Sequence, residues 1–199
     1  MGKWLIAAMV VMAGSAGGAA DFSDPDWPCV QRKQPHLSLG QVWSGPLPDA
    51  ATTARAEAPE IQALARTLEQ RRLPVDEAEA KIAAFAAGRD PADLVALYLA
   101  TFQRIEAART RVMEGITRFA HKQEALETEI DARRAEMERL QAAEPRDFDR
   151  IDALETQLDW DTRIFRDRQQ SLRYVCEAPV ILEQRAFALG RAVAGHLPN

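Results

Sequence analysis

The sequence holds 199 residues with 25 basic and 30 acidic side chains, and 47% of it is hydrophobic. A chain of this length with only two cysteines is not a disulfide-dense mini-protein, and its hydrophobic content excludes a wholly disordered chain. The formal net charge of −5 argues against a nucleic-acid-binding protein, which would carry a basic face.

Residues 1–20 have the pattern of a cleavable signal peptide. Lys3 supplies the positive start, residues 4–13 form an apolar run, and residues 14–20 are all small. Cleavage is predicted after Ala20. An uncleaved anchor is the alternative, but the apolar run is shorter than the roughly 20 residues that a spanning helix needs. We therefore expect a periplasmic or secreted protein with no stable membrane insertion after cleavage.

The predicted export determines how the two cysteines are interpreted. In an oxidising compartment, Cys29 and Cys176 are most simply one disulfide. A metal pair or a redox couple is the alternative, although the sequence has no Cys-x-x-Cys motif.

Residues 21–58 are predicted to form an extended arm and linker. They hold five of the eleven prolines, which remove backbone donors and oppose helix formation. We expect residues 50–57 to be a flexible connection. Apolar side chains indicate that the arm packs along the body of the protein, pinned at Cys29: Trp27, Val30, Leu37, Leu39, Val42 and Trp43.

Residues 59–199 are predicted to form an all-α domain, because apolar residues recur there at helical spacing between proline and glycine breaks. Two short helices are expected over residues 59–72 and 75–87. Two long helices are expected over residues 91–143 and 147–196, and Pro179 should kink the second of them.

The two long helices share one pattern of mostly apolar positions spaced alternately three and four residues apart, which we call the seam. In the first long helix it begins at Tyr98 and includes Arg109. In an antiparallel pair, one residue number rises as the facing number falls. If a turn lies at residues 144–147, the numbers of facing seam residues should therefore have a constant sum. Leu140 with Ile151, Leu126 with Phe165, and Phe102 with Leu189 all give 291. Two seams with a common registration predict a long antiparallel coiled-coil hairpin.

A few seam positions are polar. Gln123 and Arg168 are expected to face each other in one polar layer, and Arg133 is expected to pair with Asp161. Such layers commonly fix register at some cost in stability. The alternative interpretation is a buried proton or ion site.

Apolar content outside the seam is high at the open end of the hairpin and low towards the turn. Additional apolar faces need additional partners. The two short helices are therefore expected to form a small bundle with the open end, leaving the turn end as a bare two-helix stalk.

Trp160, Ile164 and Tyr174 form a stripe outside the seam, and Cys176 is expected near the same side. One interpretation is that the arm covers the stripe with Trp27 or Trp43; the other is that it contacts a partner. Phe148 at the turn is a further candidate contact. Alternatively, its side chain packs on Leu140 or Ile151.

Residue patterns for catalysis are missing from the sequence. His36, His121 and His196 are far apart, and there is no zinc-protease, P-loop, dinucleotide-binding or nucleophile-elbow motif. Glu124, Glu127 and Glu129 are interpreted as a solvated helix face. We expect no enzyme activity, no catalytic or metal-binding residues, and no cofactor.

These expectations predict an exported structural or interaction protein that acts as a coiled-coil adaptor, spacer or chaperone-like stalk. Its partner is expected to be another protein or a second copy of itself. The alternative is a small-ligand or metal-binding periplasmic module that uses the bundle end or the Asp-rich arm, in which Asp21, Asp24 and Asp26 stand.

Overall fold

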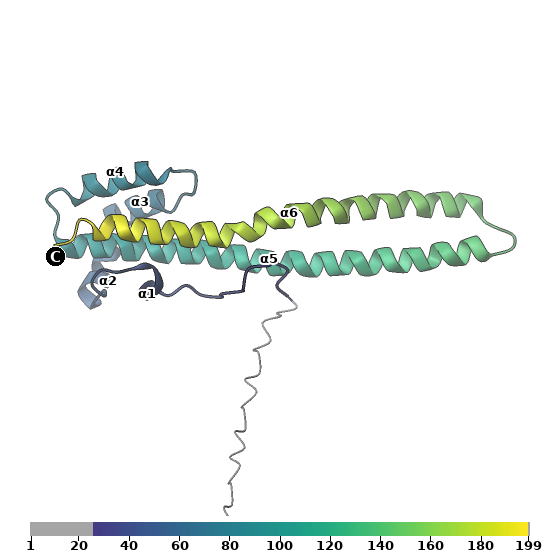
Figure 1. Cartoon of the computed structure of the whole chain (residues 1–199), viewed down its shortest axis with the longest axis horizontal. Coiled ribbons are helices and arrows are strands. Elements are labelled where there is room, and N and C mark those ends of the chain that lie inside the picture. The colour runs from purple at the N-terminus through teal and green to yellow at the C-terminus, as the bar shows by residue number, and fades with distance from the viewer. Residues whose placement is uncertain (1–25, 199) are drawn as a thin grey trace, which may run out of the picture.

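The computed structural model describes residues 26–198, so the predicted signal peptide lies outside the described residues. The described part is all-helical, with six helices and no strands (Figure 1). In chain order they are α1 Leu39–Val42, α2 Ala50–Ala56, α3 Pro59–Leu68, α4 Val75–Ala86, α5 Pro91–Ala142 and α6 Phe148–Ala194.

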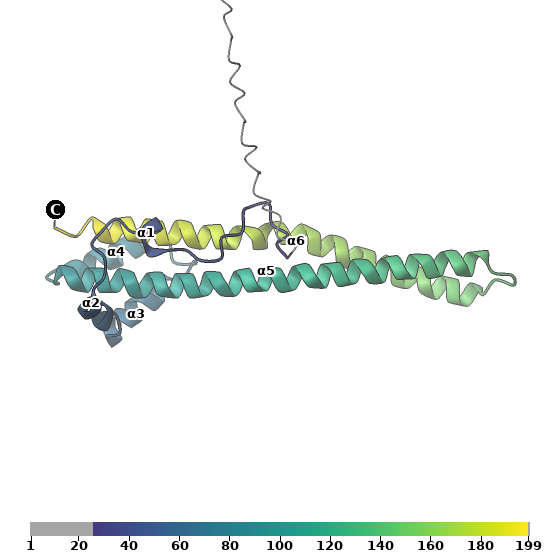
Figure 2. The same ribbon diagram turned by 90° about the horizontal axis from the view of Figure 1, so that it is seen from below.

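The two long helices form an antiparallel hairpin, as the seam predicted (Figures 1 and 2). Their 52 and 47 residues correspond to about 78 and 70 Å of helix at 1.5 Å per residue. Asp90 caps α5 by accepting a hydrogen bond from the Ala92 amide at 2.8 Å, and Pro91 supplies the first turn. Asp147 caps α6 through the Arg150 amide at 3.1 Å.

The hairpin is covered at its open end and bare towards its turn, as predicted. Helices α2 and α3 pack on α5, whereas α4 and α1 pack on α6. Side chains of the open end, such as Ile105 and Leu189, are completely buried. Leu140 and Ile151 near the turn are only half-buried, because two helices alone cannot enclose a seam.

The expectation of a flexible connection over residues 50–57 is wrong, because helix α2 occupies this segment. Asp49 caps it by accepting a hydrogen bond from the Thr52 amide at 2.7 Å, and this bond lowers the pKa of the Asp49 carboxyl. Thr52 and Ala56 are buried. A well-capped, alanine-rich segment thus forms a short helix that packs on α5.

Helix α3 ends at Leu68, earlier than the predicted boundary at residue 72. The buried Arg185 of α6 explains this, because its guanidinium donates to the Leu68 carbonyl at 2.7 Å and to the Leu73 carbonyl at 2.8 Å. The first bond satisfies a carbonyl group that the helix end leaves open, and the second holds the loop between α3 and α4. Burial lowers the pKa of Arg185.

Tyr98 joins three parts of the chain at the open end. Its buried hydroxyl lies 3.1 Å from the Val42 carbonyl oxygen and 3.0 Å from the Ala186 carbonyl oxygen. Trp43 stacks on its ring with centroids 4.4 Å apart. Gly190 is needed beside this ring, because an added Cβ would lie 2.5 Å from the Val42 carbonyl oxygen.

Candidate interaction surface of the hairpin

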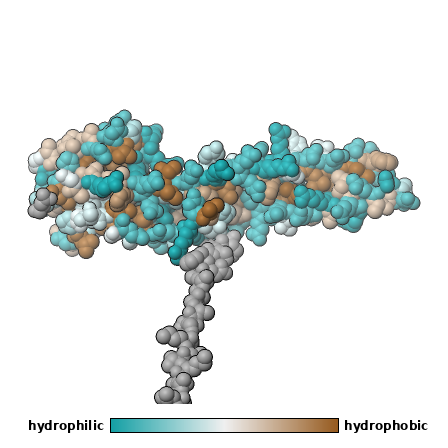
Figure 3. All heavy atoms as spheres, viewed as in Figure 1, coloured by the Kyte–Doolittle hydropathy of each residue, from teal (hydrophilic) through white to brown (hydrophobic). Residues whose placement is uncertain are grey.

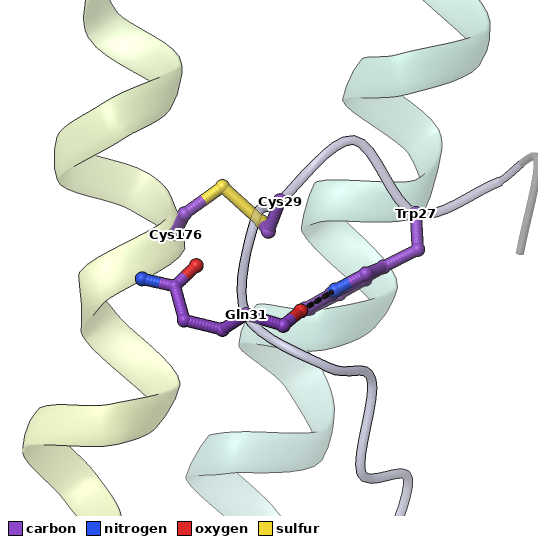
Figure 4. Close-up of a disulfide and its surroundings, with 4 residues drawn as sticks. All are labelled: Trp27, Cys29, Gln31 and Cys176. Atoms are coloured by element: carbon purple, nitrogen blue, oxygen red, sulfur yellow. Dashed lines mark hydrogen bonds between the residues drawn. A yellow bond between two sulfur atoms is a disulfide. The ribbon is translucent and has the colours of Figure 1, made fainter. Parts of the chain in front are cut away.

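A disulfide fixes the arm to the middle of the hairpin. Cys29 and Cys176 are bonded, with their Cα atoms 5.6 Å apart, as the sequence predicted. Figure 4 shows Cys29 on the arm reaching α6, while the Trp27 indole donates a hydrogen bond to the Gln31 carbonyl at 2.6 Å. The arm therefore folds back on itself at the disulfide before it continues along α5.

Polar contacts to α5 hold the next part of the arm. The Arg109 side chain, which is 3% exposed, donates to the Gln34 carbonyl at 2.6 Å. Glu106 accepts a hydrogen bond from the Leu37 amide at 3.0 Å. Sequence reasoning placed Arg109 in the seam without assigning a role. An arginine at a seam position, where a buried guanidinium needs acceptors, is the signal that could have indicated a contact with carbonyl groups of another segment.

The arm does not cover the stripe of Trp160, Ile164 and Tyr174. These side chains are 60%, 36% and 74% exposed, respectively. The expectation that Cys176 lies near the stripe is also wrong. At about 100° of helix rotation per residue, Cys176 lies roughly 160° around the helix from Trp160. The disulfide consequently draws the arm to the opposite side of the hairpin.

The two tryptophans expected on the stripe lie elsewhere. Trp43 is buried against Tyr98, and Trp27 packs within the arm near Lys33. On the arm side, Asp26 and Pro28 of the arm line a cavity of about 400 Å³ together with residues of both long helices: Phe119, Ala120, Gln123, Glu124, Glu127, Phe165, Gln169 and Leu172.

The polar layer of Gln123 and Arg168 does not form as expected. Arg168 is exposed, and Gln123 instead donates to the Phe165 carbonyl at 3.2 Å. The hairpin is loosely packed here, because Phe165 and Leu172 are only half-buried and α6 bends near its middle (Figure 1). A long arginine side chain can then reach water. The Gln123 side-chain oxygen is buried without a hydrogen-bond partner.

The other predicted polar contact is present. Arg133 and Asp161 form an ion pair of 2.8 Å across the hairpin, and Asp161 is 7% exposed. Gln157 also donates to both carboxylate oxygens at 3.1 Å. This layer ties the two helices together in the turn half of the hairpin. Within residues 26–198, no group of three His, Cys, Asp or Glu side chains could hold a metal ion here.

The turn leaves Phe148 at the tip of the hairpin. Its side chain is 66% exposed, so it does not pack into the seam with Leu140 or Ile151. Arg150 crosses to α5 and pairs with Glu136 at 2.7 Å, and this contact steadies the first turn of α6. The tip therefore presents one large aromatic side chain among charged ones.

Charge along the hairpin is unevenly distributed. Arg163, Arg166, Arg168 and Arg173 lie within eleven residues that contain a single acidic residue, Asp167. Within residues 26–198, none of these four guanidinium groups has an ion pair or a hydrogen bond, in contrast to the paired arginines towards the turn. Figure 3 shows hydrophobic side chains interspersed among the hydrophilic ones along the hairpin.

The part of the chain that the structure describes offers no cluster of metal ligands. No three His, Cys, Asp or Glu side chains in it converge on a common point. His121 pairs with Asp26 at 2.8 Å, and His36 lies 3.6 Å from Glu106. None of the described helices combines the length and apolarity needed to cross a membrane.

Comparison with known proteins gives no relative from which a role could be transferred. The sequence matches no protein family, no curated protein and no solved structure.

Proposed function

We propose that this chain is an exported, non-enzymatic interaction protein whose hairpin holds a partner protein. The observation that carries the proposal is the stripe of Trp160, Ile164 and Tyr174, whose side chains are 60%, 36% and 74% exposed on one face of α6. Large apolar side chains that gather on one exposed face commonly mark a binding site.

The construction of the hairpin supports this role. The polar layer of Arg133 and Asp161, the disulfide and the arm contacts hold a hairpin of about 70 Å in one shape. A preorganised surface loses little conformational entropy when it binds. The disulfide also favours an oxidising compartment, which agrees with the export pattern of the sequence.

Site-specific photo-cross-linking in cells tests the proposal. A photoreactive amino acid is placed at Trp160, at Phe148, or at Gln169, which lies about 180° around α6 from Trp160 and serves as the control. We expect Trp160 to yield an adduct with a different protein, identified by mass spectrometry, and Gln169 to yield much less. Adducts of the chain with itself alone, from both Trp160 and Phe148, would contradict the proposal in favour of self-assembly.

A small-ligand-binding module is the second candidate, and the cavity on the arm side favours it. This cavity has a volume of about 400 Å³ and is lined by Gln123, whose buried oxygen has no partner. A ligand that binds only the folded state raises the thermal midpoint. The midpoint is therefore measured with divalent metals, with EDTA and with a panel of small polar ligands. No shift with any of them counts against this candidate.

A further inference from the structure

The stripe on α6 lies beside the unpaired arginines described above. Relative to Trp160, the rotation of an α-helix places Ile164 and Tyr174 within about 40° on either side. The same rotation places Arg163, Arg166 and Arg173 between about 60° and 140° away, on the flank of the stripe that faces away from the seam. Asp167 and Ser171 fall on the same line between Ile164 and Tyr174. One side of α6 thus carries apolar side chains at the two ends of a strip, two polar side chains between them, and a basic border.

The spacing of the strip along α6 suits the packing of a partner helix. Trp160 and Tyr174 are two heptads apart, and Ile164 falls on the same pattern of three- and four-residue steps. From residue 160 to residue 174 the strip is about 21 Å long, which is four turns of a partner helix. At the open end of the hairpin, this chain's own helices pack on the long helices, but no described helix covers the strip.

We infer that the face formed by Trp160, Ile164 and Tyr174 with Arg163, Arg166 and Arg173 binds an acidic amphipathic helix of a partner protein. The apolar side of that helix would pack on the strip, and its glutamates or aspartates would pair with the arginines, as flanking charges do in coiled coils. This inference rests on the proposed function and specifies the face and the chemistry of the partner.

Charge opposes a symmetric pair of copies that overlap through the whole strip. The arginines lie at residues 163–173, in the centre of the apolar strip. Any two-fold pairing through the whole strip, parallel or antiparallel, would bring the two basic segments together. Like charges that face each other across an interface oppose association.

Charge also disfavours an anionic membrane surface as the occupant. Residues 124–161, which continue the hairpin towards its turn, contain 13 acidic and 5 basic side chains, a net charge of −8. A hairpin that lay flat on anionic lipids would place this acidic half against them. A helix of about 15 residues contacts only the basic segment and avoids that repulsion.

Two designed peptides test the inference. They share leucines at the heptad positions and differ only in their flanking residues, which are glutamate in one peptide and lysine in the other. Binding of each labelled peptide to the mature, disulfide-bonded protein is followed by fluorescence anisotropy. Because several flanking ion pairs act together, we expect the acidic peptide to bind at least about tenfold more tightly than the basic one.

Charge reversal should invert the preference between the two peptides, an effect that loss of folding would not produce. In R166E/R173E, the preference should invert, so that the basic peptide binds more tightly. The control R71E/R146E changes two exposed arginines outside the face by the same net charge and should keep the preference of the unaltered protein. In Y174S, both peptides should bind more weakly.

Three outcomes would overturn the inference. The first is an R166E/R173E variant that retains the original preference. The second is a lack of peptide binding together with dimerisation in sedimentation that Y174S abolishes, which would indicate a second copy. The third is binding to vesicles of phosphatidylglycerol and phosphatidylcholine but to neither peptide. If cross-links from Trp160 still capture another protein, the proposed function stands even when the charge preference fails.

Discussion

At the scale of single residues, a few buried polar side chains decide how the chain folds onto its hairpin. Tyr98 joins α5 to α6 and to the arm, Arg185 ends α3, and Arg109 holds the arm. The sequence identified Tyr98 and Arg109 only as seam positions. Their roles depend on which carbonyl groups of distant segments come within reach, and a helical repeat carries no information on that.

The close packing around Gly190 can be tested by adding a single methyl group. In Gly190→Ala, the new Cβ would lie 2.5 Å from the Val42 carbonyl oxygen and 2.9 Å from the Tyr98 hydroxyl. Overpacking of this kind should lower the free energy of unfolding by about 1–3 kcal/mol in denaturant titrations. The matched control is Gly115→Ala, where only the Arg118 side chain lies near, at 3.8 Å, and where about 0.5–1 kcal/mol of stabilisation is expected. Equal effects of the two variants would contradict the packing described for Tyr98.

The ionisation of Tyr98 should be coupled to unfolding. Burial raises the pKa of its hydroxyl above the usual 10.0. The contribution of Tyr98 to stability is therefore complete below pH 10 and is lost as the pH rises beyond it. In Tyr174→Phe, Tyr98 is the one remaining tyrosine, so the tyrosinate absorbance should appear only together with the loss of helix measured by circular dichroism. Ionisation in a fully helical protein would show that Tyr98 is accessible to solvent.

At the scale of elements, the hairpin and the disulfide that pins the arm were predictable, but helix α2 and the side on which the arm lies were not. The long helices follow from uninterrupted heptads with a common registration, and Pro91, Pro145 and the acidic caps mark their ends. Helix α2 is too short to show a repeat, so its proline-rich surroundings suggested a linker. The side on which the arm lies follows from the rotation of Cys176 around α6. The heptads also placed Arg168 in the seam, whereas its side chain is exposed.

The disulfide should stabilise the arm more than the stalk. Cys29 and Cys176 are 147 residues apart, and removal of a disulfide that closes so long a loop typically costs about 2–5 kcal/mol. In Cys29→Ser/Cys176→Ser, hydrogen exchange should accelerate in residues 26–37 and change little in residues 124–161. Unchanged exchange in the arm would mean that Arg109 and Glu106 hold it without the disulfide.

The layer of Arg133 and Asp161 should contribute more than an exposed ion pair. Arg133→Ala leaves a nearly buried carboxylate without its cation and should lower the free energy of unfolding by about 1–3 kcal/mol. Arg134→Ala removes an exposed pair with Asp131 and should cost less than about 1 kcal/mol. The apolar replacement R133M/D161L should recover most of the loss. Equal costs for Arg133 and Arg134, measured by denaturant titration, would contradict the assignment of a buried layer.

At the scale of the whole molecule, the two sides of the hairpin differ. The disulfide and Arg109 hold the arm against one side. The other side exposes Trp160, Ile164 and Tyr174 beside arginines that have no partner within the described chain. A hairpin of about 70 Å that is closed on one side and open on the other fits the proposed role of holding a partner in a defined direction.

Oxidative footprinting of the face that carries Trp160 and Tyr174 tests most directly whether a partner covers it. The oxidation rates of Trp160 and Tyr174 are measured by mass spectrometry in cells and in the purified protein, with the buried Trp43 as the internal reference in both. If a partner occupies the open side, Trp160 and Tyr174 should be protected in cells and reactive in the purified protein, while Trp43 remains unreactive throughout. Equal reactivity of Trp160 and Tyr174 in the two settings would contradict a partner on this face.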